Sequence, residues 1–303
     1  MLRKSLLVFL LLVAWPAGGL AHHTGALNIS FVNPGYGDKG FWKAVSDTMR
    51  AAADRLDIRL TIYSSDREWP KMLKNGKRAI SAAEKPDYLI LVNENQLAPD
   101  LMMQARERGI PTILLLNSLT EPQLLKYGKA RTGISNWIGS IVPDNAVAGY
   151  QMGLAILDEA RKLGLDGDGE IDLLTVVGDH RTPASLYRTA GLDRLLIQGG
   201  PLRERRRLTA YWSFDEAYKR ARIWLKTNRP EVVWAANDPI AMGVMKAARE
   251  RGLEAGVDYA IAGLNWSPEA LALVRDGRMV MTHGGHFLPG AWVMVLLYDY
   301  HLG

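Results

Sequence analysis

Hydrophobic positions along the chain alternate between short apolar runs and longer segments with helical spacing. Runs such as 88–92 (YLILV) and 171–177 (IDLLTVV) are short and mostly apolar, which is typical of buried strands. Between them, apolar residues recur at helical intervals, as in 41–56. Strands that alternate with helices of roughly 10–20 residues predict parallel sheets with right-handed crossovers.

The pattern predicts strands over 26–33, 58–63, 88–92, 112–115, 138–142, 171–177, 208–212, 232–236, 259–264 and 279–282. It predicts helices over 41–56, 72–83, 99–108, 145–163, 184–197, 214–226, 240–251, 268–276 and 290–300, whereas 118–137 has no clear pattern. These are too many strands for one sheet of ordinary size. We therefore expect an α/β protein with two Rossmann-like lobes of similar plan, divided near 142–144.

The first 21 residues have the pattern of a secretory signal peptide. Arg3 and Lys4 precede an apolar stretch over 6–14, and Gly19-Leu20-Ala21 forms a small-x-small cleavage site. The apolar stretch is too short for a membrane anchor, which needs about 20 residues. We expect residues 1–21 to be removed and the mature protein to be exported.

Composition excludes several classes of function. The 303 residues include no Cys, which excludes disulfide scaffolds, iron–sulfur clusters and cysteine nucleophiles. The net charge of +5 is mildly basic and gives no case for nucleic-acid binding. The Arg-rich run at 203–207 is expected to precede a strand as a solvated edge, with a docking patch as the alternative.

Ligands of such lobes bind beyond the carboxyl ends of the strands. The residues at these positions are mainly amides and aromatic or imidazole groups: Asn33, Asn93, Asn117, 178–181, Trp212, Asn237, Asp238, Asn265 and 283–286. They contain no Ser-His-Asp arrangement, no facing carboxylate pair and no metal triad. Amides can donate to and accept from hydroxyl groups. A neutral, polyhydroxylated solute is therefore expected, with no catalytic residue, no metal and no cofactor.

One motif supports a different function. Gly35-Tyr36-Gly37-Asp38-Lys39-Gly40 matches the dinucleotide-binding pattern between a strand and a helix, and Asp66 could bind a ribose. Asn33-Pro34 stands where the strand should enter the first glycine, and Asp66 comes 26 residues after Gly40. An exported nicotinamide-dependent oxidoreductase is the least favoured alternative, and a flexible glycine loop is the simpler interpretation.

The chain resembles the type I periplasmic solute-binding proteins that serve sugar importers, of which ribose-binding protein is the best-known plan. The resemblance covers nearly all of 26–303. It rests on the order and spacing of short motifs: Asn33-Pro34, Phe41-Trp42, 87–93, 142–149 (VPDNAVAG), 188–191 (RTAG), Trp212 with Ala217, 236–243 (ANDPIAMG), 262–265 and 276–280.

The resemblance implies two hinged lobes, 22–142 plus 286–303 and 143–285, that enclose a sugar-like ligand and rock about hinges near 142–144 and 284–287. It implies a periplasmic monomer that delivers its ligand to the membrane permease of an ABC importer. The alternative is a receptor of the same fold that partners a membrane sensor kinase or cyclase. Carried over by position, Phe41, Trp42 and Trp212 would stack on the ligand. The hydroxyl groups of the ligand would form hydrogen bonds with Asn93, Arg188, Asn237 and Asn265. Asn33 and Asn117 are further candidates for this role.

The sequence departs from the family pattern at four places. Asn265 stands where Asp is common, and the loop 35–40 is longer than usual. Gly284-Gly285-His286-Phe287 stands where many sugar binders have Gln, which makes His286 a candidate ligand contact. The chain ends soon after the helix expected at 290–300, where the family continues with a final strand and a third crossover.

Overall fold

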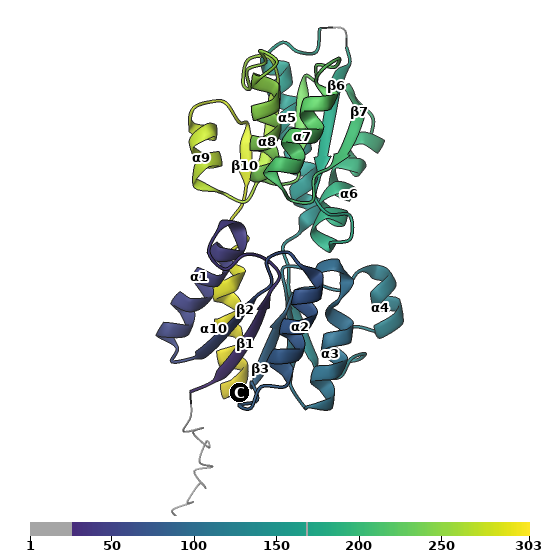
Figure 1. The fold of residues 1–303 in the computed structure, drawn as a ribbon. Helices are drawn as coiled ribbons and strands as arrows, with labels where there is room; N and C mark the ends of the chain where they lie inside the picture. The colour runs from purple at the N-terminus through teal and green to yellow at the C-terminus, as the bar shows by residue number, and fades with distance from the viewer. Residues whose placement is uncertain (1–25, 168) are drawn as a thin grey trace, which may run out of the picture.

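The protein has two lobes, each built around a five-stranded parallel sheet (Figure 1). The computed structural model describes residues 26–167 and 169–303. The predicted signal peptide, 1–21, lies outside these residues. The expected fold class, α/β with two Rossmann-like lobes of the type I periplasmic binding protein plan, is confirmed.

The first lobe contains a sheet with the strand order β2-β1-β3-β4-β5. Its strands are β1 (Asn28–Asn33), β2 (Arg59–Ser64), β3 (Tyr88–Leu91), β4 (Thr112–Leu115) and β5 (Trp137–Ile141). Its helices are α1 (Gly40–Arg55), α2 (Trp69–Ile80), α3 (Ala98–Glu107), the short α4 (Glu121–Tyr127), α10 (Pro289–Leu302) and the 3₁₀ turn η1 (Glu94–Gln96).

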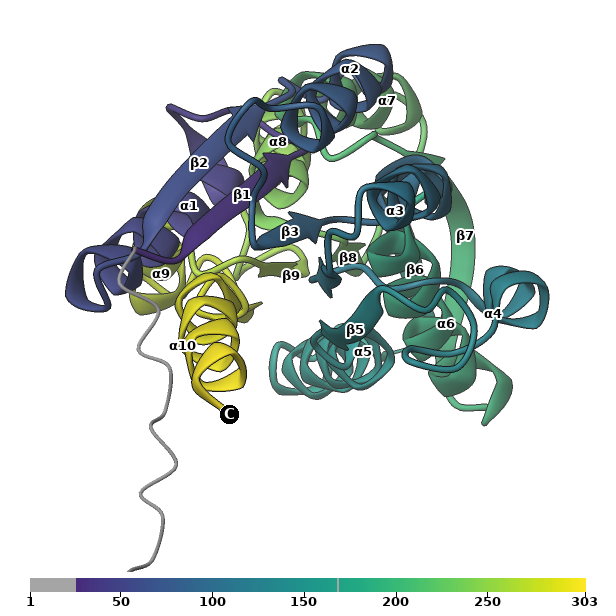
Figure 2. The ribbon, with the colours of Figure 1, turned by 90° about the horizontal axis from the view of Figure 1, so that it is seen from below.

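Alternate side chains of these strands enter two separate cores. Phe31 and Ile90 pack with α1 and α10, whereas Val32 and Leu91 pack with α2 and α3. Figure 2 shows these two pairs of helices on opposite faces of the sheet. Because both faces are covered, the strands are apolar throughout rather than alternating, which is why they are recognisable as short runs in the sequence.

The second lobe contains a sheet with the order β10-β9-β8-β6-β7. Its strands are β6 (Ile171–Val177), β7 (Leu202–Thr209), β8 (Val232–Ala235), β9 (Ala260–Leu264) and β10 (Met281–His283). Its helices are α5 (Asn145–Lys162), α6 (Pro183–Ile197), α7 (Phe214–Trp224), α8 (Asp238–Arg249) and α9 (Pro268–Arg275). The extensive core of this lobe includes the fully buried Trp234 and Tyr259.

The chain passes between the lobes after β5 and again after β10. The second passage places α10, the last helix, against α1 of the first lobe, where Val293 and Leu297 join the core with Met49. The lobe boundaries expected at 142/143 and 285/286 stay a prediction, which this arrangement supports. In the part of the chain that the structure describes, none of the helices is long and apolar enough to cross a membrane.

The solvated edge expected for the Arg-rich run is confirmed, but its position before a strand at 208–212 was wrong, because 203–207 forms part of strand β7. β7 is an edge strand whose side chains are mostly exposed, so it lacks the apolar pattern of a buried strand. Arg203, Arg205 and Arg207 are paired with carboxylates, as in Arg205 with Asp172 at 2.5 Å and Arg203 with Glu170 at 3.0 Å.

Candidate functional site

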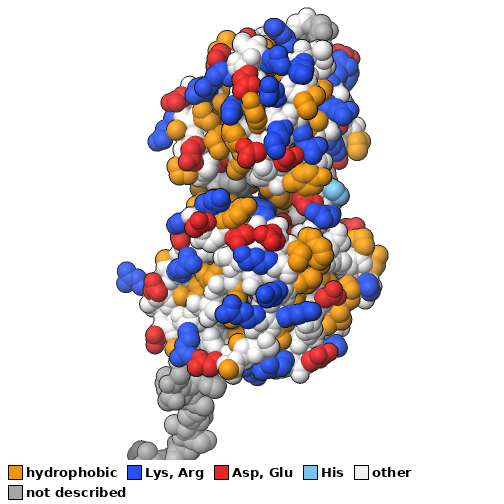
Figure 3. All heavy atoms as spheres, viewed as in Figure 1, with side chains coloured by type: hydrophobic (Ala, Val, Ile, Leu, Met, Phe, Trp, Pro, Cys, Tyr) orange, Lys and Arg blue, Asp and Glu red, His pale blue; other side chains and the backbone are white. Residues whose placement is uncertain are grey.

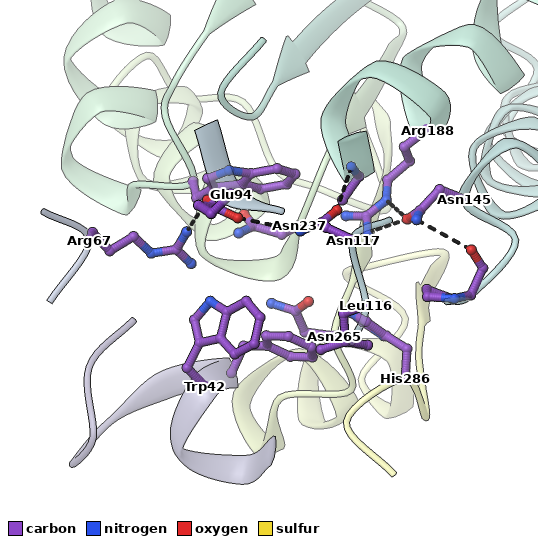
Figure 4. Close-up of a pocket in the computed structure, with 14 residues that line it drawn as sticks. Trp42, Arg67, Glu94, Leu116, Asn117, Asn145, Arg188, Asn237, Asn265 and His286 are labelled. Carbon is purple, nitrogen blue, oxygen red and sulfur yellow. Dashed lines mark hydrogen bonds and ion pairs between the residues drawn. The ribbon is translucent and has the colours of Figure 1, made fainter. Parts of the chain in front are cut away.

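A cavity lies between the two lobes, with about 470 Å³ of empty space, part of which is open to solvent (Figure 4). It collects eight of the ten candidate residues on one surface: Phe41, Trp42, Asn117, Arg188, Trp212, Asn237, Asn265 and His286. The first three come from the first lobe, the next four from the second, and His286 from the segment that connects β10 to α10. The carboxyl ends of both sheets therefore face the same cavity, as parallel sheets of this kind dictate.

Strained backbone marks the rim of this cavity. Among the described residues, eleven residues other than glycine have a positive φ, and nine of them follow the carboxyl ends of β2, β3, β4, β7 or β9. Examples are Leu116 at 64°, Trp212 at 64° and Asn265 at 148°. Such conformations cost about 1–3 kcal/mol each and persist where the surrounding structure imposes them, typically at ligand sites.

Arg188 is held in a fixed orientation on α6 by three hydrogen bonds. Its Nε and Nη2 donate to Asn145 Oδ1 at 3.2 and 2.7 Å, and its Nη1 donates to the Ala236 carbonyl oxygen. The helices α5 and α6 bring these groups together by close packing. A Cβ atom on Gly149 would lie 1.9 Å from the Arg188 carbonyl oxygen, and one on Gly191 would lie 2.0 Å from that of Ala146.

Burial lowers the pKa of Arg188 well below its usual range, to about 9, and the nearby Asp238 carboxylate opposes this shift. The side chain therefore stays charged at neutral pH, although it is only 4% exposed. Its guanidinium lies 5.5 Å from the centre of the Trp212 ring, a cation–π contact. Of its five N–H groups, three are used within the protein, which leaves two as donors at the cavity.

The side-chain amides that line the cavity differ in how many of their hydrogen-bonding groups are already used within the protein. Asn237 caps α8, because its Oδ1 accepts from the Ile240 backbone N–H at 2.9 Å, and its side-chain amino group remains available. Asn117 joins the lobes, since its Oδ1 accepts from the Ala184 backbone N–H at 2.8 Å. The Asn265 side chain makes no hydrogen bond with the described residues, whereas its backbone N–H donates to His283 O at 2.8 Å.

Aromatic groups form the wall contributed by α1. Trp42 is buried and stands edge-on to Phe41, with ring centres 5.3 Å apart. His286 stacks on Phe41 with ring centres 4.5 Å apart. Burial and the positive charge of Arg188 lower the pKa of His286 well below its usual 6.5. The imidazole is therefore neutral at pH 7, and can donate to or accept from a hydroxyl group.

Two charged side chains of the cavity, Arg67 and Glu94, are absent from the set expected from the sequence. Arg67 lies 3.6 Å from a Glu94 carboxylate oxygen, and Figure 4 shows the pair across the cavity from Arg188. Glu94 is buried, which raises its pKa, and Arg67 opposes that shift. Asn145, which binds Arg188, also lines the cavity. Both Arg67 and Glu94 follow strand ends, which was the one sequence signal available for them.

Asn33 and Asn93 are candidate residues that the structure does not place at the cavity. Asn93 donates to Gln123 Oε1 at 2.7 Å and to Ser118 O at 2.9 Å, and so anchors the segment around α4. Asn33 accepts from the Gly35 N–H at 2.7 Å and donates to Ser46 at 3.2 Å. Both are fully buried, and both use their amides to support loops beside the site.

The glycine loop over 35–40 has a packing role. A Cβ atom on Gly35 would lie 2.2 Å from the Trp42 ring, so glycine here lets the tryptophan reach the cavity. Asp66, the candidate ribose-binding acid, forms an ion pair with Lys71 instead. Among the described residues, we find no group of three or more His, Asp or Glu side chains that could hold a metal ion.

Comparisons with known proteins agree with this geometry. The family model of the periplasmic binding protein domain matches residues 29–297. The crystal structure of a periplasmic sugar-binding protein from Pseudomonas fluorescens is similar, with a TM-score of 0.82 and 35% sequence identity over 91% of this chain and 80% of that chain.

Two curated relatives are more distant in sequence. The ribose import binding protein of Salmonella typhimurium is 24% identical over 275 residues, which are 88% of this chain and 80% of the relative. The xylitol-binding protein of Mycolicibacterium smegmatis is 26% identical over 196 residues, or 64% of this chain. The match spans only 49% of that relative's length.

Proposed function

The chain belongs to the periplasmic binding protein family, and we propose that it captures one small, neutral, polyhydroxylated molecule between its lobes and releases it unaltered. The observation that carries this proposal is the composition of the cavity. It combines the fork of Arg188 and the amides of Asn237 and Asn265, which suit hydroxyl groups, with aromatic rings, which suit the C–H faces of a sugar. Relatives named as binding ribose and xylitol support the same class of ligand.

The charge balance of the cavity favours a neutral ligand. The Arg67 guanidinium is paired with the Glu94 carboxylate at 3.6 Å, and the Arg188 guanidinium is attracted by the buried Asp238. His286 is neutral, because its pKa lies well below 6.5. An anionic ligand would therefore meet no unbalanced positive charge, and its desolvation would be costly.

Ligand binding would stabilise the closed arrangement of the lobes. The bond from the Ala184 N–H to Asn117 joins the first lobe directly to the N-terminus of α6, which also carries Arg188. A ligand that contacts Trp42 from one lobe and Arg188 from the other would add to this bond. The segments 142–144 and 284–287 lie between β5 and α5 and between β10 and α10, where the chain passes between the lobes, and are the proposed hinges.

A thermal-shift screen followed by calorimetry tests the proposal. The panel contains neutral sugars and polyols, each with its corresponding sugar acid where one exists, such as glucose with glucuronate. We expect a neutral compound to raise the melting temperature and to bind at one site per chain. The proposal is wrong if sugar acids or nucleotides bind and no neutral sugar or polyol does.

We further propose that the protein acts as an exported monomer in the periplasm and delivers its ligand to the permease of an ABC importer. The naming of the Salmonella relative as an import binding protein supports this partner. The test is ATP hydrolysis by the importer complex in proteoliposomes, which the loaded protein should stimulate. Stimulation of a membrane sensor kinase or cyclase instead would assign the protein to signalling.

A further inference from the structure

A second pocket adjoins the cavity between the lobes. We call it the outer pocket, and the empty space within it, part of which is open to solvent, is about 640 Å³. Arg67, Glu94 and Trp212 line both spaces, so the two are direct neighbours along these side chains. Both lobes contribute to the outer pocket, and therefore it forms only when they are close together. Figure 3 shows acidic, basic and hydrophobic side chains together along the waist between the lobes.

The outer pocket has an exposed aromatic ring from each lobe. Trp69 is the first residue of α2 and is 51% exposed, and none of the described residues forms a ring or cation contact with it. Tyr211 follows β7 in the other lobe and is 43% exposed, with the Arg220 guanidinium 5.6 Å from its ring centre. Large aromatic side chains that remain this exposed at a cleft are suited to stack on a ligand.

Polar groups of the outer pocket suit hydroxyl groups. Asn95 lines the pocket, and its Oδ1 is buried but accepts no hydrogen bond from the described residues. An acceptor buried without a partner is unfavourable, and rotation of the Asn95 side chain toward the pocket would let a ligand hydroxyl satisfy it. The Asp179 carboxylate is bound through both oxygens by Arg181, at 3.0 and 2.7 Å, so this pair adds no net charge.

Backbone conformation distinguishes the outer pocket from an ordinary gap between lobes. Three loops at its edge each contain two consecutive residues with positive φ: 66–67, 95–96 and 211–212. The lining residues Arg67, Asn95 and Tyr211 are among them. Strained conformations that recur in three separate loops around one pocket are typical of a ligand-binding site.

We propose that the outer pocket is a second subsite, which binds a second polyhydroxylated ring joined to the one in the inner cavity. The inference rests on the proposed function and narrows it. The ligand is a two-ring compound, either a disaccharide or a glycosylated polyol. Trp69 and Tyr211 stack on its outer ring, and Asn95 accepts a hydrogen bond from one of its hydroxyl groups.

Calorimetry with matched pairs of compounds tests this inference. The pairs are xylose with xylobiose, arabinose with arabinobiose, glucose with maltose and cellobiose, and myo-inositol with galactinol. We expect the two-ring member of at least one pair to bind about tenfold more tightly than its single-ring partner. Trp69→Ala and Tyr211→Asn should each reduce this advantage about tenfold. Asparagine is chosen at 211 because it tolerates a positive φ.

A matched control is Tyr300→Ala on α10, because Tyr300 is 49% exposed but lies outside both pockets and away from the segments that connect the lobes. This control should leave the affinities for the single-ring and the two-ring compound unchanged. The melting temperatures of all variants should show that they fold. If single rings bind and every two-ring partner binds more weakly, the outer subsite is refuted while the proposed function stands. The outer subsite is also refuted if the two-ring compound still binds about tenfold more tightly than its single-ring partner after each of the two aromatic substitutions. If no member of any pair binds, the proposed function fails together with it.

Discussion

Replacement of Arg188 by Lys separates the two roles of this side chain, which are to hold the second lobe together and to bind the ligand. Lysine keeps the positive charge but loses the planar fork that now reaches Asn145 Oδ1 and the Ala236 carbonyl at once. At least one of these buried acceptors then loses its donor. An unsatisfied buried acceptor costs about 1–3 kcal/mol, so we expect the free energy of unfolding to fall by about that amount.

The effect on binding follows from the cost of burying the charge. Burial lowers the pKa of Arg188 to about 9, and at about 1.4 kcal/mol per pKa unit this shift corresponds to a cost on the order of 5 kcal/mol. Ligand oxygens that accept the two remaining N–H groups offset part of this cost. Because a hydrogen bond to a charged group contributes about 1.5–3 kcal/mol, the loss of one bond should weaken binding roughly 10–150-fold.

The assay combines urea unfolding with calorimetry, using the tightest compound from the thermal-shift screen. Arg194→Lys is the matched control, because Arg194 lies on the same helix but is exposed and stacks on Tyr150 at the surface. The control should change neither quantity measurably. Binding by Arg188→Lys within about twofold of the original protein would refute the role of the guanidinium fork in recognition.

Three further predictions concern the aromatic wall, the imidazole and the helix contact. Trp212→Ala should weaken ligand binding by about 1–3 kcal/mol through lost apolar contact, and unchanged affinity in calorimetry would reject the stacking role. Because the pKa of His286 is lowered in the folded protein, protonation on acidification favours the unfolded chain, so stability is lost as the pH falls below about 6.5. Urea unfolding at pH 5.5 and 7.5 should show a loss of about 1 kcal/mol that His286→Phe removes, and an equal loss in that variant would exclude the imidazole as its source. Gly149→Ala, whose Cβ would lie 1.9 Å from the Arg188 carbonyl oxygen, should destabilise the protein by about 1–3 kcal/mol. Gly139→Ala has open space and should be neutral, so equal unfolding midpoints for the two variants would contradict the packing argument.

The strands that lie inside each sheet could be predicted because burial on both faces makes them apolar throughout. β7 was misplaced for the opposite reason, since an edge strand with exposed side chains can be built from 203–207 and stabilised by ion pairs. The short helix α4 was missed because it spans only seven residues, although Thr120 and Gln123 form a capping box at its start.

A residue that directly follows a strand is predicted to lie near the cavity. Its position in the sequence does not predict whether its side chain lines the cavity or supports a neighbouring loop. Asn93 and Asn237 both follow apolar strands, yet Asn93 is bound to Gln123, whereas Asn237 lines the cavity. Glu94, the next residue after Asn93, turns toward the cavity because η1 begins there. Contacts with distant segments determine local backbone geometry of this kind. The periodicity of the sequence therefore cannot predict it.

Native and denaturing mass spectrometry on the protein incubated with an equimolar sugar and polyol mixture tests the central claim most directly. The account predicts a complex of one neutral polyhydroxylated molecule with one chain, from which denaturation returns a compound of the same mass and structure as the one supplied. Recovery of a nucleotide or a sugar acid, or of any product chemically different from the compounds supplied, would contradict it.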